Sequence, residues 1–203
     1  MIKKSWCIVK KKLILASSSP RRKDILIKMG LEFEIIPSDY EEIFENYDFT
    51  YEKIEQLAYY KAKSVLDKLS SSLFPLPFSL IIGADTVVVL NKKIMGKPKN
   101  ENEAMDMLKQ LSGNRHSVVT SICVIDSLNF EKKVLSTTSF VEFNILNGDL
   151  IKNYVENYKP FDKAGSYGIQ ELPEGFIINI EGSYENIIGL CPEALEKLLK
   201  EFG

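Results

Sequence analysis

The residues best suited to bind an anion lie in the segment Ser17-Ser18-Ser19-Pro20-Arg21-Arg22. This segment stands between a short apolar run and a predicted helix. Backbone N–H groups at the helix start, small hydroxyls and two guanidiniums therefore come together, and these are the groups that a phosphate requires. A serine-capped surface helix with two solvated arginines is the alternative. The segment alone favours that alternative, because helix caps far outnumber anion sites.

Carboxylates at two places have the chemistry to hold a divalent cation or to accept a proton. Residues 38–42 place three carboxylates in four positions, at Asp39, Glu41 and Glu42, and Mg²⁺ or Mn²⁺ prefers oxygen ligands. Taken alone, this segment is explained as well by a solvated acidic loop. Asp85 interrupts the most hydrophobic stretch of the chain, where an unpaired carboxylate is costly to bury. It either caps a turn within a strand, or acts in a cleft as a general base or metal ligand.

Several other polar segments are ambiguous when each is taken singly. Lys97 is fixed between a glycine and a proline, and Lys61 is one of several lysines that alternate with apolar positions. Solvated lysines explain both. Residues 161–170 and 182–186 combine glycine, tyrosine and amide side chains, which suits either contact with a nucleobase or a buried structural loop. His116 is the only histidine. It is predicted to be structural, because no nucleophile elbow G-x-S-x-G accompanies it.

Composition limits the classes of function that remain. The 203 residues carry 26 Lys plus Arg and 28 Asp plus Glu, a net charge of −2, so there is no overall basic field to hold nucleic acid. The three cysteines form no CxxC pair, which argues against a disulfide framework and a zinc knuckle. Residues 1–12 are basic and lack the apolar stretch of a signal peptide. The longest apolar run is too short to span a bilayer, and we expect a cytoplasmic protein with no membrane partner.

The elements that must position these residues are predicted from the spacing of apolar side chains. Strands are expected at residues 13–16, 33–36, 80–90, 117–126, 134–144 and near 176–180, and helices at 21–29, 51–69, 100–111, 149–156 and 192–202. Asn100 and Glu103 form a plausible capping pair at the third helix, and Pro20 suits a first helical position. Helices and strands alternate irregularly, which favours an α/β fold with a mixed twisted sheet flanked by helices.

Taken together, these segments resemble the Maf family of nucleotide pyrophosphatases. The resemblance is carried, in order, by residues 13–22, 57–62, 83–88, 96–98, 111–113, 162–170 and 182–184. It extends from about Leu13 to the end of the chain. It implies a single Maf-like domain over residues 13–203 after an N-terminal extension of residues 1–12, with two lobes around a substrate cleft and commonly a homodimer.

The resemblance also implies roles for individual residues. Asp85 is similar to the family's catalytic carboxylate, which accepts a proton from water, and Glu42 matches an acidic residue that binds the metal or water. The implied cofactor is a divalent cation, Mg²⁺ or Mn²⁺, held by Asp85 and Glu42. The implied phosphate ligands are Ser17, Arg21, Arg22, Lys61 and Lys97. The sequence reads Asp-Tyr-Glu-Glu where many members have Asp-x-Asp-Glu, which leaves Asp39 and Glu41 without a defined role.

Three positions sort family members by nucleobase. Here they are Arg21, Thr86 and Gln170, a combination that resembles the branch acting on dTTP, UTP and modified pyrimidine triphosphates. The branch acting on 7-methyl-GTP usually has Trp and an acidic residue in place of Arg21 and Gln170. An amide both donates and accepts, so Gln170 can pair with a uracil or thymine edge. Alternatives are the same reaction on a modified purine such as 7-methyl-GTP or ITP, a nucleic-acid-binding regulator of cell division without turnover, and an inactive scaffold. The acidic balance argues against nucleic acid.

Overall fold

The computed structural model describes residues 11–41, 46–71 and 78–202. They form a mixed α/β fold around one seven-stranded sheet, which confirms the predicted fold class. The elements in chain order are β1 (Lys12–Leu15), α1 (Pro20–Lys28), β2 (Phe33–Ile35), α2 (Tyr51–Ser70), β3 (Ser79–Leu90), β4 (Lys93–Met95), α3 (Glu101–Leu111), β5 (Arg115–Asp126), β6 (Lys132–Phe143), α4 (Gly148–Tyr158), the 3₁₀ turn η1 (Ala164–Ser166), β7 (Ile177–Glu181), α5 (Tyr184–Ile188) and α6 (Pro192–Lys200).

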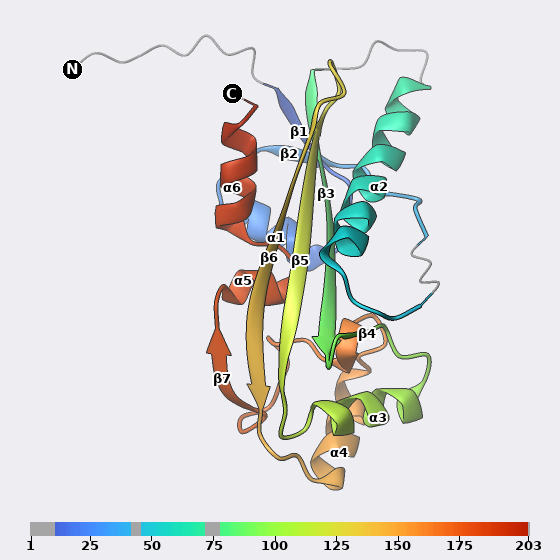
Figure 1. Cartoon of the computed structure of the whole chain (residues 1–203), viewed down its shortest axis with the longest axis vertical. Helices are drawn as coiled ribbons and strands as arrows, with labels where there is room; N and C mark the ends of the chain where they lie inside the picture. Colours follow the sequence, from blue (N-terminus) through green and yellow to red (C-terminus); the bar gives the residue numbers. More distant parts are fainter. Residues whose placement is uncertain (1–10, 42–45, 72–77, 203) are drawn as a thin grey trace, which may run out of the picture.

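The sheet runs in the order β2-β1-β3-β5-β6-β7, and β4 pairs with the end of β3. The pairs of β1 with β2 and of β1 with β3 are parallel, whereas β3, β5, β6 and β7 pair antiparallel. Strands β3, β5 and β6 have 12 residues each and extend for about 40 Å. They run along the length of the molecule and connect its two ends (Figure 1). This arrangement gives two lobes that share the same long strands.

Helices cover the two faces of the sheet at one end and pack together at the other. In the upper half of Figure 1, α2 lies on one side of the long strands, and α1 and α6 lie on the other side. Separate apolar clusters fill these two layers. In the lower half, α3, α4 and η1 enclose a third cluster against β3, β5 and β6, with Phe143, Tyr154 and Phe176 among its largest buried side chains. Each lobe therefore has its own core.

The edge of β3 has a gap between two shorter strands. Strand β1 pairs with Ser79 to Ile82, and β4 pairs with Val88 to Leu90. Over residues 83–87, none of the described strands pairs with that edge. The gap lies just beyond the carboxyl end of β1, and ligands of α/β proteins characteristically bind beyond the carboxyl ends of strands. Side chains from both faces of β3 can reach this opening.

Gly83 lets helix α2 approach β3 more closely than any other residue would. A Cβ atom at this position would lie 2.2 Å from the carbonyl oxygen of Ala58 and 2.7 Å from the amide nitrogen of Ala62. The strand and the helix are thus in backbone contact. Because side chains alternate along a strand, Asp85 projects toward the same helix as Gly83. This close contact determines where Lys61, on the adjacent turn of α2, meets Asp85.

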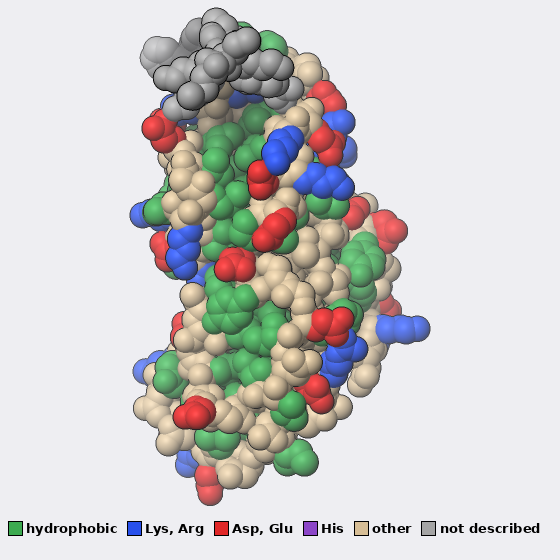
Figure 2. Space-filling model, turned by 90° about the vertical axis from the view of Figure 1, so that its left-hand side faces the viewer, with side chains coloured by type: hydrophobic (Ala, Val, Ile, Leu, Met, Phe, Trp, Pro, Cys, Tyr) green, Lys and Arg blue, Asp and Glu red, His purple; other side chains and the backbone are tan. Residues whose placement is uncertain are grey.

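The surface carries charges of both signs. On the face shown in Figure 2, Lys and Arg side chains are interspersed with Asp and Glu, around areas of hydrophobic side chains. None of the helices in the described part of the chain is both long enough and apolar enough to cross a membrane. Cys123 and Cys191 are buried free thiols, as expected for core cysteines, and burial raises the pKa of Cys123 to about 12.

Most predicted elements are present, with shifted ends. Asn100 accepts a hydrogen bond from Glu103 N, and the Glu103 carboxylate accepts one from Lys99 N, which confirms a capping pair with a displaced second bond. Strand β5 begins two residues earlier than predicted, at Arg115. Helix α5 was not predicted. Its five residues are too few for a helical apolar pattern, and Ser183 caps it by accepting from Asn186 N.

Replacing Gly83 with alanine tests the packing of α2 on β3. We expect Gly83→Ala to lower the free energy of unfolding by about 1–3 kcal/mol or more, because the new methyl group overpacks a backbone contact. Urea denaturation followed by circular dichroism measures the change. Gly148→Ala is the matched control, since no atom lies within 4 Å of the added Cβ, and its effect should stay within about 0.5 kcal/mol. Equal stability of the two variants would contradict the close approach.

Candidate active site

A cleft of about 410 Å³ opens at the gap in the β3 edge. It is lined by the turn after β1, one side of α2, the middle of β3, the segment after β4, and the loop of residues 162–171. The lining includes eight of the sequence-predicted site residues, namely Ser17, Arg21, Arg22, Lys61, Asp85, Thr86, Lys97 and Gln170. Glu42, the ninth, lies outside the described residues. Residues up to 153 positions apart in the chain, from Ser17 to Gln170, thus meet in one cavity.

Asp85 and Lys61 form a buried ion pair on the wall of the cleft. Their exposed fractions are 3% and 9%, and Lys61 Nζ donates a short hydrogen bond to Asp85 Oδ1. Burying a carboxylate inside a valine-rich strand is tolerated because the ammonium compensates its charge. The pair places a carboxylate and an ammonium group side by side, at the point where the cleft meets the strand.

The turn after β1 is held in shape by its own side chains. Ser17 Oγ accepts hydrogen bonds from Ser19 N and from Arg22 Nη1, both at 3.2 Å. Ser19 is the N-cap residue of α1 in an extended conformation, and Pro20 occupies the first turn, where its fixed φ suits the start of a helix. The N-terminus of α1 therefore faces the cleft with serines and arginines on it, the arrangement expected of an anion site.

Arg22 is fixed by three acceptors from different parts of the chain. Its Nε donates to the Gly189 carbonyl at 2.9 Å, and its Nη2 donates to Thr86 Oγ1 at 3.2 Å, in addition to the bond with Ser17. Thr86 Oγ1 also lies 2.9 Å from Thr120 Oγ1 and 3.2 Å from the Gly189 carbonyl. The planar guanidinium is thus locked in the cleft wall between α1, β3 and the end of α5.

Asn186 anchors α5, and with it the Gly189 carbonyl, to strands β5 and β6. It is fully buried, its carbonyl accepts from Thr120 Oγ1, and its side-chain amide donates to Val118 O and to Ser139 Oγ. These bonds fix α5 against β5 and β6, and so fix the Gly189 carbonyl that binds Arg22. Residues 182–186, which the sequence left ambiguous, therefore serve a structural purpose.

The loop of residues 161–171 forms the opposite wall. Arg21 Nη1 lies 3.4 Å from Asp162 Oδ2 across the mouth of the cleft. Gln170 is exposed, and it lines both the main cleft and an adjoining hollow of about 230 Å³. Below it, Gly168 N donates to Tyr154 Oη at 3.2 Å. Burial also raises the pKa of that phenol to about 12, so Tyr154 stays neutral and structural.

His116 and Tyr167 join this loop to the long strands. His116 Nε2 and Tyr167 Oη lie 2.7 Å apart, and both rings pack edge-on against Phe143. Burial lowers the pKa of His116 to about 4, which makes it a neutral imidazole at physiological pH. The prediction of a structural histidine agrees with this position, since His116 is absent from the cleft lining.

The oxygen donors of the cleft fit a hard divalent cation. Mg²⁺ is usually bound through one or two carboxylates together with substrate phosphates and water, and Asp85 is a carboxylate on the wall of the cleft. Among the described residues there is no group of three or more His, Cys, Asp or Glu side chains arranged for a metal. A metal here would accordingly rely on Asp85, Glu42 and the bound substrate.

Lys163 is a lining residue that the sequence analysis did not single out. Its side chain is 8% exposed, and its ammonium contacts Asp162 Oδ1 at 2.8 Å and Glu171 Oε2 at 3.2 Å. A lysine next to an aspartate is common on protein surfaces, so the pattern carried no signal. The structure alone reveals that this lysine is buried beside the cleft.

Comparison with known proteins identifies relatives of this chain. The sequence model of the family described as Maf-like protein matches residues 12–202. A protein named dTTP/UTP pyrophosphatase from Ruminiclostridium cellulolyticum is 44% identical over 94% of this chain and 96% of its own length. Proteins of the same name from Acetivibrio thermocellus and Clostridium novyi are 43% and 41% identical, each over 95% of this chain and over 96% and 98% of their own lengths.

His116 predicts a pH dependence of stability. The folded-state pKa of about 4 lies below the ordinary value near 6.5, so on acidification the unfolded chain takes up the proton first. The stabilisation is therefore complete above about pH 6.5 and is lost as the pH falls toward 4. We expect the His116→Gln variant, whose amide can still bond Tyr167, to lose about 2 kcal/mol less than the wild type between pH 7.5 and pH 5. Urea denaturation at both pH values measures this, and parallel losses in the two proteins would contradict it.

Proposed function

Since the chain belongs to the Maf family, we propose that it is a nucleoside triphosphate pyrophosphatase that converts dTTP and UTP to the monophosphate and pyrophosphate. The observation that carries the proposal is the convergence of eight of the nine predicted site residues on one cleft, with Asp85 and Lys61 buried together on its wall. The names of the relatives support the choice of nucleotide.

We infer that the cationic groups of the cleft bind the triphosphate. Arg22, the N-terminus of α1, Lys61 and Lys97 all line the cleft. Guanidinium and ammonium groups together with helix N–H groups stabilise phosphate oxygens. Because this charge is fixed before the substrate binds, it also stabilises the charge that develops on the leaving pyrophosphate. The protein thus contributes chiefly positioning and charge.

Asp85 is the general base in this proposal. Its carboxylate pairs with Lys61 and lines the cleft, where it can accept the proton of a water that attacks the α-phosphorus. The O–P bond to water forms as the bond to the bridging oxygen breaks, and pyrophosphate leaves. The ammonium of Lys61 compensates the charge of this carboxylate where both groups are buried.

We further propose that Asp85 and Glu42 hold a divalent cation, Mg²⁺ or Mn²⁺. A bound cation would supply Lewis-acid stabilisation of the phosphate oxygens. The carboxylate of Asp85 suits such an ion, and Glu42 follows the described segment that ends at Glu41.

The nucleobase is proposed to lie toward Arg21 and Gln170. Both residues line the main cleft and the adjoining hollow, whose lining does not include Lys61. The amide of Gln170 can donate to O4 and accept from N3–H of uracil or thymine. Thr86 faces Arg22 rather than the hollow, so its influence on base choice would act through that arginine.

Pyrophosphate release from purified protein tests the reaction. With Mg²⁺ or Mn²⁺ present, turnover is measured on dTTP, UTP, CTP, ITP, GTP and 7-methyl-GTP. We expect the highest kcat/KM on dTTP and UTP. Preference for a purine triphosphate would be consistent with the proposed reaction but would contradict the proposed recognition of uracil and thymine. Absence of turnover on every nucleotide would overturn the proposed function in favour of a binding protein.

Asp85→Asn should lower kcat by about 10²–10⁴-fold, which is the usual contribution of a general base. Binding of a non-hydrolysable UTP analogue, measured by calorimetry, should change little, because the amide oxygen still accepts from Lys61. The matched control is Asp126→Asn, since Asp126 is also buried and pairs with a lysine, Lys11, outside the cleft. Near-normal turnover of Asp85→Asn would remove Asp85 as the base.

Gln170→Glu should lower the ratio of kcat/KM for UTP over 7-methyl-GTP by about tenfold, because a carboxylate cannot donate to O4 and one hydrogen bond to the base is lost. Gln110→Glu on the exposed surface of α3 is the control for the added charge. An unchanged substrate profile in Gln170→Glu would argue against this base-recognition assignment.

A further inference from the structure

Lys163 occupies a position that is unusual for a lysine. Its side chain is 92% buried, on the wall of the cleft, yet it is separate from the Lys61–Asp85 pair. Burying an ammonium requires compensation, and here two carboxylates provide it, Asp162 at 2.8 Å and Glu171 at 3.2 Å. The reaction proposed above makes no use of this group.

The fold makes room for the stem of this lysine. A Cβ atom on Gly168 would lie 2.8 Å from Lys163 Cε and 3.2 Å from Glu171 Oε2. Glu171 N also donates to Gly168 O at 2.9 Å, which closes a turn over the lysine. Gln170 is inside that turn, directly before Glu171. The ammonium thus holds the turn that presents the Gln170 amide.

The same ionic network reaches Arg21, the other residue proposed to lie near the nucleobase. Asp162 accepts from Lys163 through Oδ1 and lies 3.4 Å from Arg21 through Oδ2. Burial opposes ionisation of Asp162, but the hydrogen bond and charge of Lys163, with the charge of Arg21, lower its pKa. A continuous ionic chain, Arg21–Asp162–Lys163–Glu171, therefore connects α1 to the loop across the mouth of the cleft, with two cations and two anions.

We propose that Lys163 is a specificity-determining positioning residue, which fixes Gln170 in the orientation that selects uracil and thymine. This inference rests on the proposed function. Lys163 acts through its neighbours and touches neither the α-phosphorus nor the attacking water. Its removal should therefore change the choice of base more than it changes phosphoryl transfer.

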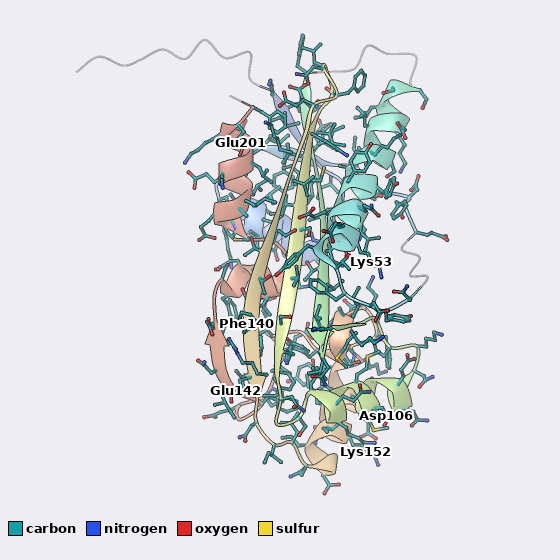
Figure 3. All side chains as sticks on the ribbon, in the orientation of Figure 1. Lys53, Asp106, Phe140, Glu142, Lys152 and Glu201 are labelled. Carbon is teal, nitrogen blue, oxygen red and sulfur yellow. The ribbon has the colours of Figure 1, made fainter. Side chains whose placement is uncertain are left out.

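The test compares UTP with CTP, whose edges differ at position 4 of the ring. In Lys163→Met we expect the ratio of kcat/KM for UTP over CTP to fall about tenfold, the value of one hydrogen bond to the base. Glu171→Gln, which keeps the shape of the side chain, should lower the ratio in the same direction. Lys152→Met is the control, because Lys152 lies in an exposed pair with Glu156 on α4, at the far end of the molecule (Figure 3).

A double-mutant comparison separates positioning from a general loss of stability. If Lys163 acts through Gln170, then Lys163→Met should change the UTP/CTP ratio less than twofold when Gln170 is already alanine. An unchanged ratio in both Lys163→Met and Glu171→Gln would overturn the inference, as would an equal fall with and without Gln170. If circular dichroism shows that Lys163→Met does not fold, the UTP/CTP ratio of Glu171→Gln tests the inference instead. Absence of pyrophosphate release by the wild type would instead refute the proposed function.

Discussion

The buried contact between Lys61 and Asp85 is the interaction on which the cleft depends. It requires a helix packed against a strand without an intervening side chain, which Gly83 permits, and a strand edge left open between β1 and β4. Breaking such a pair by removing one partner generally costs about 3–5 kcal/mol, because the other charge stays buried and uncompensated. In the proposed reaction the same two groups serve the chemistry, since a carboxylate beside a fixed cation suits the activation of water next to a phosphate. Packing and function are therefore coupled at this point.

The remainder of the cleft is built from supports that lie outside it. Asp85 and Thr86 project from opposite faces of strand β3. The face that carries Thr86 is joined to α1 and α5 by the hydrogen bonds of Arg22 to Thr86 and to the Gly189 carbonyl. Asn186 holds α5 from within the core. On the opposite wall, His116, Tyr154 and Lys163 hold the loop that carries Gln170. The proposed catalytic carboxylate on β3 and the loop that carries Gln170 are thus held by separate sets of bonds.

Much of this could be predicted from the sequence, because apolar runs and caps are local signals. The strand around Asp85, the helix of Lys61 and the turn of Ser17 were all predicted near their observed bounds. Helix α5 was not, since five residues show no period and Ser183 acts as a cap only when the chain turns there. Strand β5 starts early because Arg115 stacks on Phe140 and pairs with Glu181 across the sheet. The burial of Lys163 depends on Gly168 and Glu171 folding over it, which no local pattern encodes. The role of Glu42 stays a prediction.

In the proposed reaction, water attacks the α-phosphorus of the bound triphosphate. The most direct test is hydrolysis of UTP by the wild-type protein in water enriched in ¹⁸O, with the products analysed by mass spectrometry. The account predicts that the label enters UMP and that pyrophosphate remains unlabelled. Label in pyrophosphate would place the attack on the β-phosphorus, and formation of UDP with labelled inorganic phosphate would place it on the γ-phosphorus. Either result would contradict the arrangement of the cleft proposed here.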